Sequence, residues 1–195
     1  NNSCINNTPF SFILLEKGCV HNLFTHAFVV TRAGGFELNT YEKLLDTACR
    51  DGIDVIDYPF ETERIKGLYC DGTVAIRKGI KTQAEKSCIL AEELGHHYTT
   101  TGNILDQSTD VMNRKQEYRA RLYGYNLRVG LIGIINAYEA RCRNLHEMAE
   151  HLDVPEDYLT EVIDCYRSKY GQYVAVDNYI IYFIPQLAVI GINTL

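Results

Sequence analysis

Regular spacing of apolar residues begins at Asn39 and first predicts a helix. Asn39 or Thr40 can cap this helix, and Leu44 and Ala48 lie on one of its sides. An Asp-Gly pair at 71–72 separates two short apolar runs, a pattern typical of a tight β-hairpin. A small antiparallel sheet is therefore predicted after the first helix. Its expected elements are strands over 53–58, 67–70 and 73–77, with a helical turn over 61–65.

The rest of the pattern is mainly helical, so the chain as a whole predicts an α+β fold. Thr82 and Glu85 have the spacing of a capping box and predict a helix over 82–98. A turn at Asp153-Val154-Pro155 between two amphipathic segments resembles a helix-turn-helix. Apolar runs on either side of Asp177-Asn178 predict a final strand pair. The expected elements are helices from about 113 and over 131–140, 145–152 and 156–169, and strands over 173–176 and 179–183.

Residues 1–38 differ from the regular part of the chain. This segment is poor in acidic residues and shows neither a sustained helical nor a sustained strand period. We interpret it as a non-native or disordered N-terminal extension, translated past a natural start at Leu38. A loosely packed N-terminal arm is the alternative.

The composition indicates a globular, cytoplasmic protein. Of the 195 residues, 46% are hydrophobic and 23% charged, as in an ordinary domain. No apolar stretch has the ~20 residues needed to span a bilayer. Seven scattered cysteines without a C-x-x-C pair favour reduced thiols. Because the net charge is -6, we expect no direct binding to nucleic acid and no membrane partner.

The segment from Ala91 to His97, A-E-E-L-G-H-H, has the spacing of a metalloprotease helix. In an H-E-x-x-H motif, two metal ligands four residues apart project from one helix face, and the glutamate after the first ligand is the general base. Here Glu92 stands in the place of the first histidine, His96 is the second ligand, and Glu93 keeps the base position. Apolar residues flank the motif, so the helix is expected to be packed. Packed carboxylates need partners, and a divalent ion would supply one.

A hydrolytic metal site needs a third protein ligand and one open position. Glu117, on the next long helix, is the best candidate for that ligand. An E-E-x-x-H segment by itself is common in acidic helices. A solvated acidic face followed by a histidine is therefore the alternative to a metal site.

Glu117 is followed three residues later by Ala120, and with this pairing the two motifs resemble those of the ImmA/IrrE family of zinc-dependent peptidases. In that family a ligand glutamate precedes a small alanine that lets the two helices approach. The resemblance runs from about Asn39 to Phe183. It implies three parts: a zincin-like minimal metallopeptidase domain over 39–128, with a small antiparallel sheet, a motif helix and a ligand helix; a helix-turn-helix-like segment over 129–171; and a strand pair and tail over 172–195.

The resemblance also implies a role for each motif residue. Glu92, His96 and Glu117 would be the metal ligands. Glu93 would be the catalytic base, taking a proton from metal-bound water and passing it to the leaving amine. Two carboxylates and one imidazole cancel the charge of a divalent ion, which predicts weaker water activation than the usual motif and tolerance of manganese as well as zinc. The candidate transition-state donors are His97, Tyr98, Tyr118 and Tyr123.

The substrate implied by the resemblance is a helix-turn-helix repressor that keeps a phage or other mobile element silent. The chain's own helix-turn-helix-like segment is expected to support or dock protein, because residues 141–170 carry four basic and seven acidic side chains. A non-catalytic regulator that binds a repressor, or a toxin-antitoxin or stress-response component, is the alternative. A basic cluster on the ligand helix is interpreted as a solvated outer face or a contact for an acidic partner; it consists of Arg114, Lys115, Arg119, Arg121 and Arg128.

Overall fold

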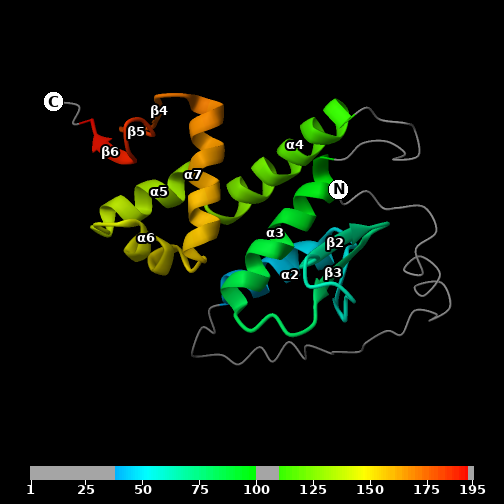
Figure 1. Cartoon of the computed structure of the whole chain (residues 1–195). Coiled ribbons are helices and arrows are strands. Elements are labelled where there is room, and N and C mark those ends of the chain that lie inside the picture. The colour runs from blue at the N-terminus through cyan, green and yellow to red at the C-terminus, as the bar shows by residue number, and fades with distance from the viewer. Residues whose placement is uncertain (1–37, 100–109, 193–195) are drawn as a thin grey trace, which may run out of the picture.

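A computed structural model of the chain describes residues 38–99 and 110–192, with side chains from 113 in the second range. The fold is α+β, as predicted: helices accompany two small three-stranded sheets (Figure 1). The interpretation of residues 1–38 as an extension falls outside the described residues, apart from Leu38, which is exposed. In the described part of the chain, no helix combines the length and apolar character that a bilayer-spanning segment needs.

Helix α2 spans Thr40–Arg50, as the sequence pattern predicts. Asn39 is its N-cap, and the side chain of Asn39 accepts a hydrogen bond from the Glu42 N–H at 2.9 Å. The Glu42 carboxylate accepts in return from the Asn39 N–H, which completes a capping box. Leu44 and Ala48 are buried on one side, so the helix is fixed to the first sheet by its apolar face.

The first sheet consists of β1 (Asp54–Tyr58), β2 (Gly67–Cys70) and β3 (Thr73–Arg77), in the order β1-β3-β2. The prediction of an antiparallel sheet was wrong, because β1 and β3 are parallel and only β2 and β3 are antiparallel. Asp71 and Gly72 have φ of 51° and 79° and form the predicted hairpin, which places β3 beside β2. The other edge of β3 then pairs with β1. The predicted helical turn over 61–65 consists of bends and a turn.

Helix α3 (Gln83–Thr99) begins after Thr82, whose hydroxyl accepts from the Glu85 N–H at 3.1 Å. The carboxylate of Glu85, expected to complete a capping box, accepts from Lys66 Nζ at 2.8 Å. Helix α4 (Asp110–Arg128) starts three residues earlier than the predicted position near 113. The two helices lie side by side across the middle of the molecule (Figure 1).

Small residues allow the backbones of α3 and α4 to approach closely. A Cβ atom built on Gly95 would lie 2.1 Å from the carbonyl oxygen of Ala120, and one built on Gly124 would lie 2.8 Å from that of Ala91. Such distances leave room for hydrogen alone. Gly95, Gly124, Ala91 and Ala120 therefore set both the separation and the register of the two helices.

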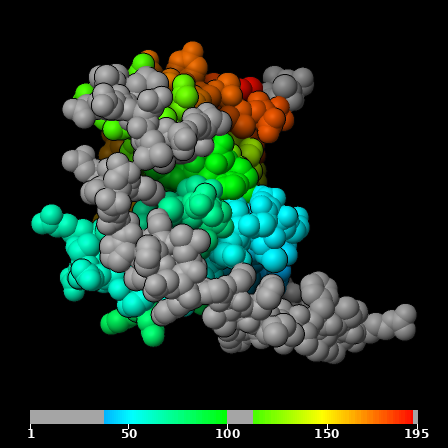
Figure 2. Space-filling model, turned by 90° about the vertical axis from the view of Figure 1, so that its right-hand side faces the viewer, coloured from blue at the N-terminus to red at the C-terminus, as the bar shows by residue number. Residues whose placement is uncertain are grey.

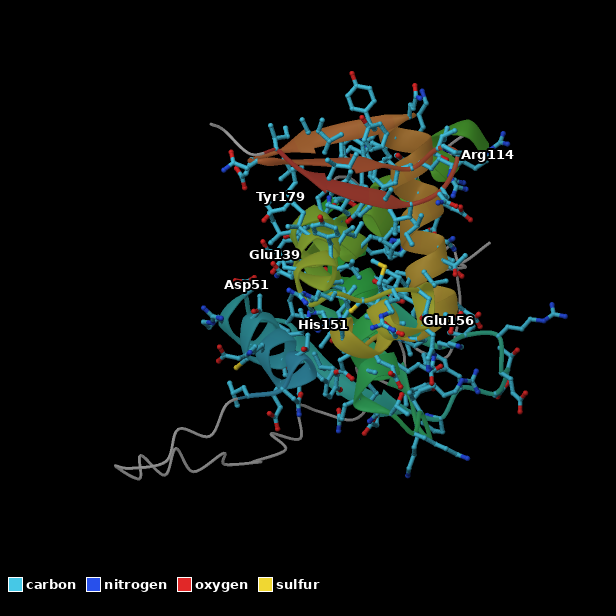
Figure 3. All side chains as sticks on the ribbon, turned by 90° about the vertical axis from the view of Figure 1, so that its left-hand side faces the viewer. Asp51, Arg114, Glu139, His151, Glu156 and Tyr179 are labelled. Carbon is cyan, nitrogen blue, oxygen red and sulfur yellow. The ribbon has the colours of Figure 1, made fainter. Side chains whose placement is uncertain are left out.

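The C-terminal part contains the predicted helix-turn-helix-like pair, α6 (Leu145–Leu152) and α7 (Glu156–Tyr170), preceded by α5 (Gly130–Glu139). A sheet of three antiparallel strands follows, where a strand pair was predicted. Its third strand, missed from the sequence, lies beyond a loop at 183–187. The hydroxyl of Tyr179 donates to Glu139 and ties this sheet to α5 (Figure 3). The strands are β4 (Tyr173–Val176), β5 (Tyr179–Tyr182) and β6 (Ala188–Gly191).

Two hydrophobic cores meet at the pair of central helices. One contains Leu90 and Leu94 of α3 and faces the first sheet, and the other surrounds Tyr166 and Phe183. Figure 2 shows the surface of α3 and α4 in green between the cyan N-terminal and orange C-terminal parts. Arg128, only 8% exposed, donates from Nε to the buried Ser87 hydroxyl at 2.7 Å. Its interpretation as part of a solvated outer face was therefore wrong.

Replacing Gly95 with alanine should destabilise the protein by about 3 kcal/mol or more, because the new methyl group meets backbone that cannot rotate away. Gly133→Ala in α5 is the matched control, since its Cβ would lie 3.3 Å from the flexible end of Leu152 and alanine favours a helix by about 1 kcal/mol. Urea unfolding measures both changes. Equal midpoints for the two variants would contradict the close backbone contact.

Candidate functional site

Three of the predicted site residues lie around the contact between α3 and α4. On α3, Glu92, Gly95 and His96 share one face because residues three and four apart are neighbours on a helix. Gly95 touches the backbone of Ala120. Glu117 stands one turn before Ala120 on α4, which brings its carboxylate to the side of α3 that carries Glu92 and His96.

In the structure the three predicted ligands lie near one another. His96 Nε2 lies 3.6 Å from Glu117 Oε2. Arg121 Nε donates to Glu117 Oε1 at 2.8 Å and lies 3.4 Å from Glu92 Oε1. The two carboxylates therefore share one cationic group, and the imidazole stands beside one of them.

Burial is the largest influence on the pKa values of Glu92 and His96. Burial raises the pKa of Glu92; the positive charge of Arg121 opposes this shift and the negative charge of Glu117 adds to it. Burial also lowers the pKa of His96, although Glu117 acts in the opposite direction. The imidazole is therefore held toward its neutral form, the form in which histidine binds a metal ion.

Glu93 is rotated by about 100° from Glu92 around the axis of α3 and lies against the first sheet. A Cβ atom built on Gly67 of β2 would lie 2.7 Å from Glu93 Oε1, so the glycine leaves the space that the carboxyl group fills. Burial raises the pKa of Glu93 to about 8, with a further contribution from the charge of Glu92. The backbone N–H of Tyr69 hydrogen-bonds the carboxylate and acts against that shift. The base candidate is thus enclosed between a helix and an edge strand.

The four candidate transition-state donors have partners elsewhere. His97 Nδ1 lies 2.8 Å from the Tyr69 hydroxyl. Tyr98 donates to Asp51 at the end of α2 and packs against Tyr123, with ring centroids 5.0 Å apart. Tyr118 is hydrogen-bonded to Cys165 of α7. The described contacts do not bring these side chains to Glu92, His96 and Glu117, so their proposed role stays a prediction.

The residue types at the site suit a divalent ion, but their side chains are not positioned to hold one in this structure. In residues 38–99 and the described part of 110–192, no three His, Cys, Asp or Glu side chains form a cluster ready to hold a metal. Two carboxylates and one neutral imidazole are nevertheless a ligand set that zinc or manganese accepts. Arg121, with 48% of its side chain exposed, lies between the two carboxylates. A metal ion at this position would therefore require that this side chain turn away and that the three donor side chains move closer together.

Sequence reasoning missed two residues that shape the site. Arg121 was grouped with a basic cluster interpreted as a solvated outer face or a contact for an acidic partner; it is exposed, but its contacts with Glu92 and Glu117 were not predicted. Its spacing of four from Glu117 is that of a helical ion pair and could have revealed it. Gly67 opens a strand and carries no signal of its closeness to Glu93, because that contact depends on how the sheet meets α3.

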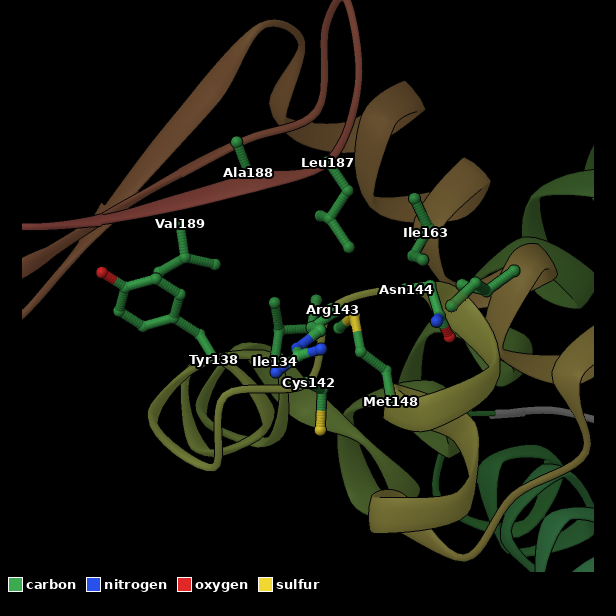
Figure 4. Close-up of a pocket in the computed structure, with 11 residues that line it drawn as sticks. Ile134, Tyr138, Cys142, Arg143, Asn144, Met148, Ile163, Leu187, Ala188 and Val189 are labelled. Atoms are coloured by element: carbon green, nitrogen blue, oxygen red, sulfur yellow. The ribbon is translucent and has the colours of Figure 1, made fainter.

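A separate cavity of about 230 Å³ lies between the C-terminal helices and β6 (Figure 4). Mainly apolar side chains line it, among them Ile134, Met148, Leu187 and Val189. None of the candidate metal ligands contributes to this lining, so the cavity is distinct from the site on α3 and α4.

Comparison with family models, with curated proteins and with solved structures found no match. A function for this site therefore rests on its own residues. What they offer is a pair of carboxylates that need a cation, a neutral imidazole beside them, and a buried carboxyl group next to an edge strand.

Gly67→Ala should destabilise the protein by about 2 kcal/mol, because its Cβ would overlap Ile89 Cγ2 at 2.6 Å as well as Glu93. Gly191→Ala is the control, because Gly191 also lies in a strand, β6, but a Cβ atom built on it would have its nearest neighbour 3.7 Å away. Chemical denaturation followed by circular dichroism compares the two variants. If Gly67→Ala unfolds at the wild-type midpoint, β2 does not pack against Glu93 as described.

Proposed function

We propose that the protein is a metal-dependent endopeptidase of the ImmA/IrrE type, most simply zinc-dependent. One observation carries the proposal: Glu117 of α4 lies beside His96 of α3 and shares the Arg121 guanidinium with Glu92 of α3, and the carboxyl group of Glu93, the residue after Glu92, lies against β2. The E-E-x-x-H spacing and the pair Glu117 and Ala120 support the same assignment. The close approach at Gly95 and Ala120 is what such a site requires.

Each residue has a defined task in this proposal. Glu92, His96 and Glu117 would hold the ion, which supplies Lewis acidity toward the scissile carbonyl and its attacking water. Glu93 accepts the proton of that water and returns it to the leaving amine. The hydrogen bond from the Tyr69 N–H orients the Glu93 carboxylate, and Gly67 leaves room for it.

The position of β2 supports a peptide substrate. Among the described strands, in the sheet order β1-β3-β2, this strand pairs with β3 alone. An extended peptide can add to such an edge through main-chain hydrogen bonds. Since Gly67 and Tyr69 of β2 contact Glu93, a peptide lying along this strand would pass close to the base.

A regulatory protein, in particular a helix-turn-helix repressor of a prophage or integrative element, is the substrate we propose. The proposed setting is the cytoplasm, where such a repressor is found. The acidic first turn of α7, with Glu156 and Asp157, supports protein docking by the helix-turn-helix-like pair over contact with phosphates. His146 connects the pair, with Nδ1 3.3 Å from Glu156.

A second function is favoured by the position of Arg121. This side chain already contacts both carboxylates and supplies one positive charge between them without a metal ion. A protein with such a site could act by binding a repressor without cleaving it. The two functions differ in whether the Glu93 carboxyl group is needed.

Glu93→Gln should abolish proteolysis while preserving the fold, because the amide fills the same space but cannot accept the proton. Loss of acid-base catalysis predicts a rate of peptide-bond cleavage that is lower by a factor of at least about 10². Zinc-supplied wild type and variant are incubated with a bacterial lysate, and new protein N-termini are identified by mass spectrometry. Circular dichroism checks the fold. Glu63→Gln, a change to an exposed carboxylate on the 59–66 connection, is the control.

New N-termini that appear with wild type and Glu63→Gln but not with Glu93→Gln would support the peptidase. An equal set with all three proteins, or none above the buffer background, would contradict it. In that case capture of a repressor by both wild type and Glu93→Gln becomes the remaining function.

A further inference from the structure

Arg121 is the feature of the site that the proposed chemistry leaves unexplained. Its Nε lies 2.8 Å from Glu117 Oε1 on its own helix and 3.4 Å from Glu92 Oε1 on α3. One guanidinium group thus offsets one of the two negative charges and joins the helices that carry them. A guanidinium in such contacts forms strong, charge-assisted bonds.

We propose that Arg121 is an internal counter-ion that competes with the divalent ion for Glu92 and Glu117, and so sets the metal affinity of the site. This inference rests on the proposed function, because it takes these two residues as ligands. It adds a determinant that the ligand motif itself does not contain. The site then alternates between an arginine-filled state and a metal-filled state.

The charges at the site favour either Arg121 or a divalent ion between the two carboxylates, and disfavour both together. Two carboxylates carry -2, and Arg121 brings the group to -1. With a divalent ion and Arg121 both in place, the group would carry +1, and two cations would stand within a few ångströms of each other. Their repulsion in a partly buried site disfavours that state. A divalent ion with Arg121 turned away leaves the ligand group neutral.

The geometry permits the exchange without movement of the backbone. Arg121 follows Glu117 by one turn, and 48% of its side chain is exposed. Rotation about its own side-chain bonds can therefore carry the guanidinium group into solvent. The close contacts of Gly95 and Gly124 hold α3 and α4 in place, so side-chain rotations alone have to turn Arg121 away and close the donor side chains around the ion.

Binding of the metal alone tests this competition. Protein freed of metal with a chelator is titrated with zinc chloride, and separately with manganese chloride, by isothermal calorimetry. Arg121→Gln should bind about tenfold more tightly than wild type, a change of about 1.4 kcal/mol. Arg119→Gln removes an exposed positive charge from the same helix and should bind as wild type does.

Two further variants assign the effect to this site. Arg121→Gln combined with Glu117→Gln should lose the tight binding, because a ligand is missing. Arg121→Met, which also removes the charge but keeps an aliphatic stem, should bind as tightly as Arg121→Gln. Circular dichroism of each metal-free protein checks that it is folded. If Arg121→Gln does not fold, Arg121→Met takes its place in the titrations.

The outcomes separate this inference from the function on which it rests. Metal binding of equal affinity in wild type and both Arg121 variants, or weaker binding in the variants, overturns the competition but leaves the metal site intact. No binding to wild type or to either folded Arg121 variant overturns both the competition and the metal-dependent peptidase. Tighter binding in the Arg121 variants that Glu117→Gln removes supports both.

Discussion

The contact between the backbones of α3 and α4 determines the rest of this structure. With Gly95 against Ala120 and Gly124 against Ala91, the helix axes come near enough for carboxylate and imidazole side chains to meet across them. Larger residues would separate the helices, and Glu117 would no longer reach His96. The same two helices divide the molecule into its two hydrophobic cores, so the site lies where the N-terminal and C-terminal parts join.

That packing places negative charges close together in a partly buried position. It brings Glu92 and Glu117 to the same place, and burial of a carboxylate costs free energy unless a positive group is near. Arg121 supplies a positive group from within the chain. A divalent ion would supply one from outside, with different chemical consequences. The contact with Arg121 and the proposed metal binding thus depend on the same few oxygen atoms.

Local patterns predicted most elements because the determinants are local. The Asn39 cap, the Asp71-Gly72 turn and the Thr82 cap each act within a few residues, and the helices and strands they delimit are present. The error in the first sheet concerns strand pairing. Val74, Ala75 and Ile76 form an unbroken buried run, the mark of a central strand, and that signal could have indicated that β3 lies between the other two.

The candidate ligands were predictable for a similar reason, and their neighbours were not. Spacing on one helix relates Glu92 to His96, and the small residue after Glu117 indicates where the second helix approaches. The contacts of Arg128 with Ser87 and of Gly67 with Glu93 join segments far apart in the chain. Only the folded arrangement brings such pairs together. In the same way, β6 is a strand because it pairs with β5, and this pairing has no local signal in the sequence.

Anomalous diffraction at the zinc edge, from crystals grown with zinc, examines most directly whether these side chains surround one cation. A single strong peak within coordinating distance of Glu92, His96 and Glu117, with the Arg121 guanidinium turned toward solvent, is the expected result. Crystals in which zinc binds elsewhere, while Arg121 still bridges the two carboxylates, would contradict a metal site between α3 and α4.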